Sequence, residues 1–126
     1  MTPIKRVFIS HKFRDNPDAN LREIIEIGKR LAKLNIAYFS PITNYCALDD
    51  ADGAQREFGL KCCEEWIQYC DELWLFGEWE KSEGCQREHL TALLELIPVY
   101  IVTGWTEDEL PIFAGEMPSW IRRNDE

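Results

Sequence analysis

The fold of this chain is decided by residues 73–88, which read LWLFGEWEKSEGCQRE. The first four, Leu73–Phe76, form a short apolar run of the kind that is buried as a strand in a parallel sheet. Ser82 follows a turn and can cap a helix, because its side-chain oxygen can accept a hydrogen bond from a free backbone N–H group of the first turn. A buried strand that leads into a helix is the repeating unit of α/β folds.

The same alternation continues on both sides of this stretch. Short apolar runs predict three further strands, at Val7–Ile9, Ile36–Phe39 and Val99–Val102. Strands that alternate with helices across short turns imply a parallel sheet covered on both faces. We therefore predict a single α/β domain, a Rossmann-like (flavodoxin-like) three-layer sandwich with a parallel sheet of four to five strands.

Three helices are predicted between these strands. The first covers about residues 21–34 with Asp18 or Asn20 as its N-cap, the second about residues 54–69, and the third starts near Ser82. The side chains expected to be buried from the second and third helices are Phe58, Leu60, Cys62, Cys63, Trp66, Ile67 and Cys70, and then Cys85, Leu90, Leu93, Leu94 and Leu96.

The composition excludes several classes of function. Among 126 residues there are 23 acidic and 14 basic side chains, a formal net charge of −9. Nucleic acid or an anionic membrane would require clustered Lys and Arg, so neither is expected as a partner. Five cysteines without a C-x-x-C pair and only two histidines favour neither a disulfide framework nor a metal centre. No apolar run reaches about 18 residues, so we expect a cytoplasmic protein.

A candidate site follows from the predicted topology. Ligands of open α/β sheets bind beyond the carboxyl ends of the strands, where the strand order reverses. Three segments are expected to meet there, namely Ser10–Arg14, Pro41–Tyr45 and Gly77–Glu88. The helix that begins at Ser82 would direct free N–H groups toward a ligand, and the carboxylate of Glu88 could point into the same crevice.

Each of these residues also has a purely structural interpretation. Ser82 and Glu88 could provide no more than a helix cap and an exposed helix charge. Trp79 could stack on a base or belong to the core, and Arg14 could bind a phosphate or pair with an aspartate in solvent. Cys85, close to a helix N-terminus, is the only cysteine for which a lowered pKa is expected.

A family resemblance adds to these observations. Residues 70–77, followed by Trp79, Ser82, Gly84 and Glu88, resemble the nucleoside 2-deoxyribosyltransferase-like superfamily, whose core motif after the third strand is Ser-x-Gly-x-x-x-Glu. The resemblance covers about residues 5–102. An uncharacterised branch of that superfamily, often encoded by phages or bacteria, is similar in a second set of positions: Val7–Ser10, Arg14, Asn20, Arg56, Glu57, Gly59 and Leu60.

The resemblance implies an enzyme that acts on the N-glycosidic bond of a deoxynucleoside or deoxynucleoside monophosphate, by base transfer or hydrolysis. It makes Glu88 the nucleophile that attacks the anomeric carbon. The substrate-binding residues that it implies, together with their neighbours in the crevice, are Ser10, His11, Arg14, Trp79, Ser82 and Gly84. A small-molecule nucleoside or nucleotide is the expected partner, and no cofactor and no metal are expected.

Two alternatives stay open. Cys63 stands where active members of the superfamily carry an aspartate, which favours a binding module that has the crevice without the chemistry. In addition, Val7–His11, and Ser82, Cys85 and Glu88 at three-residue steps, resemble the Toll/interleukin-1 receptor domain, some members of which cleave NAD with a helix glutamate.

The last residues are predicted to form a separate unit. We expect residues 1–103 to form the domain and residues 104–126 a C-terminal tail, packed on the domain or on a partner subunit. The tail carries large apolar side chains that would form an adhesive patch if exposed, namely Trp105, Ile112, Phe113, Met117 and Trp120. Members of the resembled superfamily commonly complete their sites across a dimer interface, so a homodimer is expected.

Overall fold

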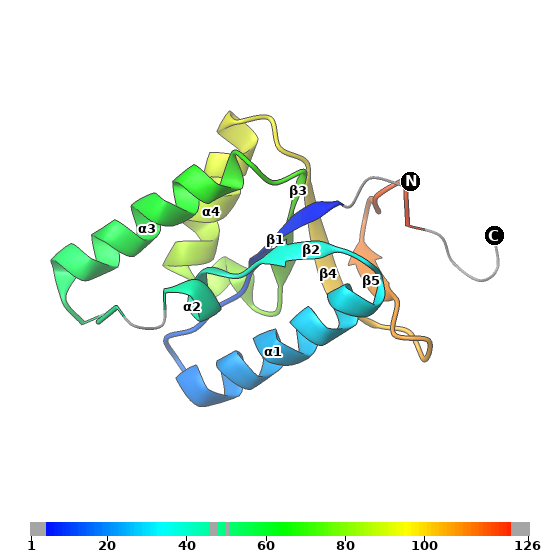
Figure 1. The fold of residues 1–126 in the computed structure, drawn as a ribbon, viewed down its shortest axis with the longest axis horizontal. Helices are drawn as coiled ribbons and strands as arrows, with labels where there is room; N and C mark the ends of the chain where they lie inside the picture. The colour runs from blue at the N-terminus through cyan, green and yellow to red at the C-terminus, as the bar shows by residue number, and fades with distance from the viewer. Residues whose placement is uncertain (1–4, 46–47, 50, 122–126) are drawn as a thin grey trace.

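A computed structural model of the chain describes residues 5–45, 48–49 and 51–121. Its centre is one five-stranded sheet in the order β2-β1-β3-β4-β5 (Figure 1). The strands are β1 (Arg6–Ser10), β2 (Ala37–Phe39), β3 (Glu72–Phe76), β4 (Val99–Trp105) and β5 (Pro111–Ala114). The first four are parallel and β5 is antiparallel to β4. The predicted α/β fold class is confirmed, with an antiparallel fifth strand added.

The helices cover both faces of this sheet. They are α1 (Pro17–Lys33), the short α2 (Pro41–Asn44), α3 (Gly53–Ile67) and α4 (Glu83–Leu94), with a 3-10 turn at Trp79–Lys81. Helix α1 lies on one side of the sheet, and α3 and α4 lie on the other (Figure 1). None of the helices formed by the described residues is long and apolar enough to cross a membrane.

The protein has two hydrophobic cores, one on each face of the sheet, because successive side chains of a strand point to opposite faces. Val7 and Ile9 of β1 point toward α1, where Ile27 and Leu31 meet them, whereas Phe8 points toward α3 and α4. All three β1 side chains are at most 1% exposed. Because β1 and β3 are covered on both faces, they read as continuous apolar runs in the sequence.

The start of α1 differs from the prediction. The N-cap is Asn16, and the helix begins at Pro17, whose fixed φ suits the first helical position. Asn20 lies inside the helix instead, where its side-chain amide donates to the Phe13 carbonyl at 2.9 Å and to Asp15 at 3.0 Å. Its role is therefore to hold the loop that follows β1.

The predicted apolar face of α4 is largely wrong. The residues of α4 that face the sheet are Cys85, Glu88 and Ala92, which recur at three- and four-residue steps. The side chains predicted as buried but found more than 40% exposed are Phe58, Trp66, Leu90, Leu93, Leu94 and Leu96. These apolar side chains lie on the outer surfaces of α3, α4 and the turn after α4.

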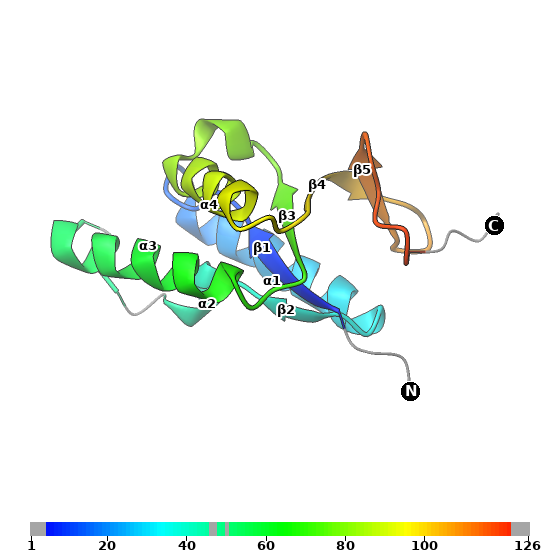
Figure 2. The same ribbon diagram turned by 90° about the horizontal axis from the view of Figure 1, so that it is seen from above.

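The predicted tail begins within β4 and supplies β5, so part of it is a regular strand of the sheet. Four of its five large apolar residues, Trp105, Phe113, Met117 and Trp120, pack on the core that faces α1, whereas Ile112 is 39% exposed. The ring of Phe113 meets Trp74 edge-on at 5.1 Å, and Trp120 stacks on Trp74 at 6.3 Å. Figure 2 shows β5 at the sheet edge far from α3. Residues 122–126 lie outside the described part, and the boundary at residue 103 stays a prediction.

Candidate active site

A pocket of about 170 Å³ opens at the carboxyl ends of β1 and β3. The strand order reverses between these two strands, which is the position where α/β sheets bind ligands. All three predicted segments contribute to its lining, and α3 contributes a fourth group that the sequence analysis missed. The lining residues from α3 are Gln55, Arg56, Gly59, Leu60 and Cys63.

Glu88 lies in this pocket as a buried carboxyl group. Its side chain belongs to the sheet-facing side of α4, and the residue is 6% exposed. The Ser10 hydroxyl, at the end of β1, donates a hydrogen bond of 2.7 Å to Glu88 Oε1. The strand β1 pairs with β3, and β3 leads into α4, so the sheet register brings together two residues that are 78 positions apart. The alternative of an exposed helix charge is wrong.

Burial changes the acidity of Glu88. Removal from water raises its pKa to about 7, and hydrogen bonds with the Ser10 hydroxyl and the Cys63 thiol offset part of that rise. Neither of these partners carries a positive charge. Burial therefore disfavours the ionised form of Glu88, and no cation among these partners offsets that effect.

Ser82 and Gly84 form the start of α4. Ser82 Oγ accepts a hydrogen bond of 3.2 Å from the Cys85 backbone N–H, so the predicted cap is present. Gly84 lines the pocket, and a Cβ added there would find its nearest neighbour, Ser82 Oγ, only at 3.9 Å. Packing within the protein therefore does not require glycine at this position.

The two cysteines that line the pocket, Cys63 and Cys85, are buried. Cys85 is 1% exposed, and burial raises the pKa of its thiol to about 11, although the helix N-terminus was expected to lower it. Burial and the neighbouring Glu88 likewise raise the pKa of Cys63 well above its usual range. Both thiols therefore stay protonated at neutral pH. Cys46 lies outside the described residues.

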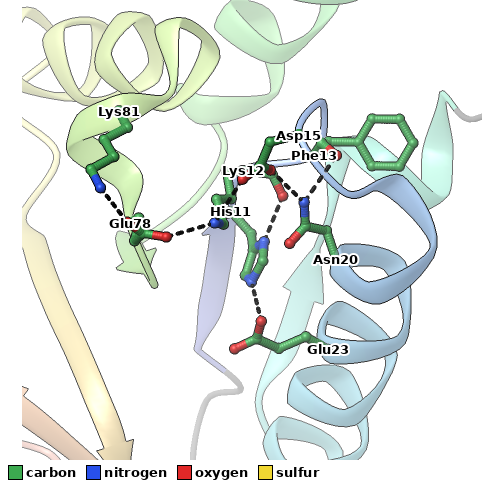
Figure 3. A network of polar contacts seen from close by, with 8 residues as sticks. All are labelled: His11, Lys12, Phe13, Asp15, Asn20, Glu23, Glu78 and Lys81. Carbon is green, nitrogen blue, oxygen red and sulfur yellow. Dashed lines mark hydrogen bonds and ion pairs between the residues drawn. The ribbon is translucent and has the colours of Figure 1, made fainter.

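His11 is a buried member of the pocket lining. Its Nδ1 lies 2.7 Å from the Lys12 carbonyl oxygen, and its Nε2 lies 3.1 Å from a carboxylate oxygen of Glu23 on α1 (Figure 3). These contacts fix the orientation of the imidazole ring at the start of the loop that follows β1.

The same loop is tied to the turn after β3. Lys12 donates to Glu78 at 2.9 Å and to Asp15 at 3.0 Å, and Glu78 also accepts from Lys81 at 2.6 Å (Figure 3). Hydrogen bonds to Glu78 and Asp15 raise the pKa of Lys12 to about 12, and hydrogen bonds from Lys81 and Lys12 lower that of Glu78 to about 2. The loop carries Phe13 and Arg14 into the pocket lining.

The remaining predicted residues lie in different places. Arg14 lines the pocket together with Arg56, which forms an ion pair of 2.9 Å with Glu83. Trp79 is outside the pocket lining; it packs on the core beneath α4 and meets His89 edge-on at 5.2 Å. Among the residues that the structure describes, no group of three or more His, Cys, Asp or Glu could hold a metal ion.

Three comparisons place this architecture among known proteins. Residues 5–102 match a family described as a domain of unknown function (DUF7768). No curated protein matches the chain. Among solved structures, the chain is similar to a 2-deoxyribosyltransferase from Bacillus psychrosaccharolyticus, with a TM-score of 0.64 and 19% identity over 78% of this chain and 72% of that chain. At this identity the similarity shows a shared fold and a distant structural relationship.

Proposed function

Because this chain belongs to the DUF7768 family, whose description names no activity, we propose its function from its own site. The protein cleaves the N-glycosidic bond of a deoxynucleoside or deoxynucleoside monophosphate, or transfers the sugar to a second base, with Glu88 as nucleophile. The observation that carries the proposal is the Glu88 carboxyl group, buried in a pocket at the strand ends and hydrogen-bonded by Ser10. The structurally similar 2-deoxyribosyltransferase, described as a biocatalyst for nucleoside synthesis, shares the fold that presents this pocket.

The proposed reaction has two steps. Ionised Glu88 attacks C1′ of the sugar, a C–O bond forms, and the C1′–N bond breaks, so that the base leaves with the bonding electrons and takes up a proton. Water, or a ring N–H of a second base, then attacks C1′, loses a proton to solvent and releases Glu88 as a carboxylate; this proton balances the one that the leaving base took up from solvent in the first step. The Ser10 hydrogen bond orients the Glu88 oxygen and stabilises the carboxylate that the second step regenerates.

The pocket lining supports an orientation for the substrate. Phe13, Ile42 and Leu48 provide apolar surface for a base. Tyr45 adds to this surface and is held in place by Trp66, whose indole N–H donates to the Tyr45 hydroxyl at 2.9 Å.

The sugar end would face the start of α4. In this orientation Ser82 and Gly84 contact the sugar, and His11 also lines the pocket. The guanidinium groups of Arg14 and Arg56 supply the positive charge that a 5′-phosphate requires.

A product assay tests the proposal. The protein is incubated with a panel of deoxynucleosides, their monophosphates and NAD, and free base is measured by chromatography. Base release from a deoxynucleoside or its monophosphate is expected, and Glu88→Gln should lower the rate about a thousandfold or more. The matched control is Glu95→Gln, an exposed glutamate at the end of the same helix, which should keep full activity.

The main alternative is a nucleotide-binding module without catalysis. It is favoured by Cys63, which lines the pocket at the position where the resembled superfamily carries an aspartate. Nucleotide binding in calorimetry, without release of base from any member of the panel, would support the module. Release of nicotinamide from NAD alone would instead support the cleavage of NAD.

We also propose that the protein is a cytoplasmic homodimer. The tail does not support the dimer, because four of its five large apolar side chains, all but Ile112, pack on the chain's own core. The support comes from α4 and the turn after it, where Leu90, Leu93, Leu94 and Leu96 are 54–88% exposed. A second copy that brings the same surface would bury these side chains symmetrically.

The cytoplasmic location is supported by the free thiols of the four described cysteines.

A further inference from the structure

One amide group in the pocket lining has a fixed orientation. Gln55 lies in the first turn of α3 and lines the pocket, and its Oε1 accepts a hydrogen bond of 2.8 Å from the Asp49 backbone N–H. Only the oxygen of an amide can accept from an N–H group, so this contact decides which end of the Gln55 amide is the carbonyl. The NH2 end is left to donate, and among the described residues none accepts a hydrogen bond from it.

Gln55 stands at the open end of a row of lining residues on α3. Gln55, Gly59 and Cys63 follow one another at four-residue steps, so they share the face of the helix that borders the pocket. Cys63 is buried and Gln55 is exposed, and the helix rises about 12 Å between them. The row therefore leads from the closed end of the pocket to its open end. Glu88, which is also buried, lies at the closed end.

A base whose sugar is held at Glu88 extends along this row toward Gln55. The Leu48 side chain is part of the apolar surface assigned to the base, and its Cδ1 lies 3.3 Å from the position that a Cβ of Gly59 would occupy, beside the middle of the row. The edge of a base that lies away from the glycosidic bond carries the group at position 4 of a pyrimidine or position 6 of a purine. This edge is the part of the base that meets the open end of the pocket.

We propose that Gln55 is a specificity-determining residue that selects bases with a carbonyl oxygen on this edge. Uracil, thymine, hypoxanthine and guanine carry an oxygen there, which accepts from the Gln55 NH2 group, whereas cytosine and adenine carry an amino group, which is itself a donor. Two donors that face each other leave both without a partner, which costs affinity. The inference rests on the proposed function and names the class of base that the same site takes.

A purely structural Gln55 makes a different prediction. The contact with Asp49 also holds the loop that precedes α3, and this alone would explain the residue. Gln55→Glu separates the two roles, because a carboxylate has nearly the size of the amide and still accepts from the Asp49 N–H, but replaces the donor by a second acceptor. The exchange is compatible with the helix, since a negative charge in the first turn of a helix is stabilising.

The test measures the affinity for matched pairs of ligands by calorimetry, in a Glu88→Gln background so that no ligand is consumed. The pairs are deoxyuridine with deoxycytidine and deoxyinosine with deoxyadenosine, each also as the 5′-monophosphate. With Gln55 in place, the oxo member of each pair should bind about five- to tenfold more tightly than the amino member. Gln55→Glu should reverse this preference. The control is Gln68→Glu, an exposed glutamine after the end of α3 that does not line the pocket, which should keep the preference.

A preference that is lost or reversed in Gln55→Glu, with the control unchanged, supports the proposal. Equal affinities within both pairs, or a preference that Gln55→Glu leaves unchanged, overturn it. The absence of binding by any of these ligands, in this background and in the wild-type protein alike, overturns it together with the proposed function. Release of base is measured separately, in proteins that retain Glu88. Release without a preference would refute the role of Gln55 alone, whereas a preference in binding without release would refute the proposed reaction and leave the role of Gln55 supported.

Discussion

Replacement of Glu88 by glutamine should stabilise the folded protein at alkaline pH while it abolishes the proposed activity. Glutamine keeps the size of the side chain and an oxygen that can accept the Ser10 hydrogen bond. It removes the charge that burial disfavours. The buried carboxyl group is thus expected to serve function at a cost in stability, as is common in active sites.

The magnitude follows from the pKa of Glu88. Burial raises it from 4.5 to about 7, a difference of about 2.5 units. Each unit corresponds to about 1.4 kcal/mol, so ionised Glu88 destabilises the folded state by roughly 3 kcal/mol. Because the pKa of the folded state is raised, the stability contributed by neutral Glu88 is fully present below about pH 4.5 and is lost as the pH rises through about 7. The glutamine variant has no such dependence.

The assay is urea denaturation of both proteins at several pH values between about 4 and 8.5. The difference in unfolding free energy should be small at the acid end and should grow to about 3 kcal/mol in favour of Glu88→Gln at the alkaline end. Other titrating groups are shared by the two proteins and cancel in this difference. Glu95→Gln, which replaces an exposed carboxylate, should show no comparable trend. A difference for Glu88→Gln that does not increase with pH would refute the reasoning.

Four further predictions concern activity and assembly. The rate of base release should rise with pH through about 7, because Glu88 must be ionised to attack; a flat kcat profile between about pH 5 and 8 would contradict this. Ser10→Ala should move that rise to higher pH by removal of a donor to Glu88, as measured by the same profile, and an unmoved profile would exclude the role of Ser10. Lys12→Gln should raise KM more than it lowers kcat, because the hydrogen bond from Lys12 to Glu78 holds the loop whose residues line the pocket. A fall in kcat with an unchanged KM would contradict this role of Lys12. Leu94→Glu should convert the proposed dimer to a monomer in light scattering with an unchanged circular dichroism spectrum, whereas an unchanged mass would remove α4 from the interface.

The fold could be predicted from the sequence because its central strands are buried on both faces. Leu73–Phe76 has no polar residue to compete with this interpretation, and the structure buries every residue of β3. The place of Glu88 could be predicted for a related reason, since a residue one and a half turns into the helix after a central strand must lie near the strand ends. Its partner Ser10 ends the neighbouring parallel strand, so the same topology brings the two together.

Other features depend on packing that no local pattern determines. The leucines of α4 recur at helical spacing, but so do Cys85, Glu88 and Ala92, and only the contact with the sheet decides which of the two faces is buried. The acidity of Cys85 was misjudged because the helix N-terminus is visible in the sequence, whereas the burial that outweighs it is not. The contribution of α3 to the pocket could not be predicted either, because it depends on how α3 packs beside α4 and not on any local sequence pattern.

The most direct test of the central claim is to trap the intermediate on Glu88. A deoxynucleoside analogue with fluorine at C2′ slows the second step, because the electron-withdrawing group destabilises positive charge at C1′. After incubation with such analogues, peptide mass spectrometry should find one sugar unit attached through an ester to Glu88, with one equivalent of free base released. Release of base without any modification of Glu88, or modification that persists in Glu88→Gln, would contradict the account.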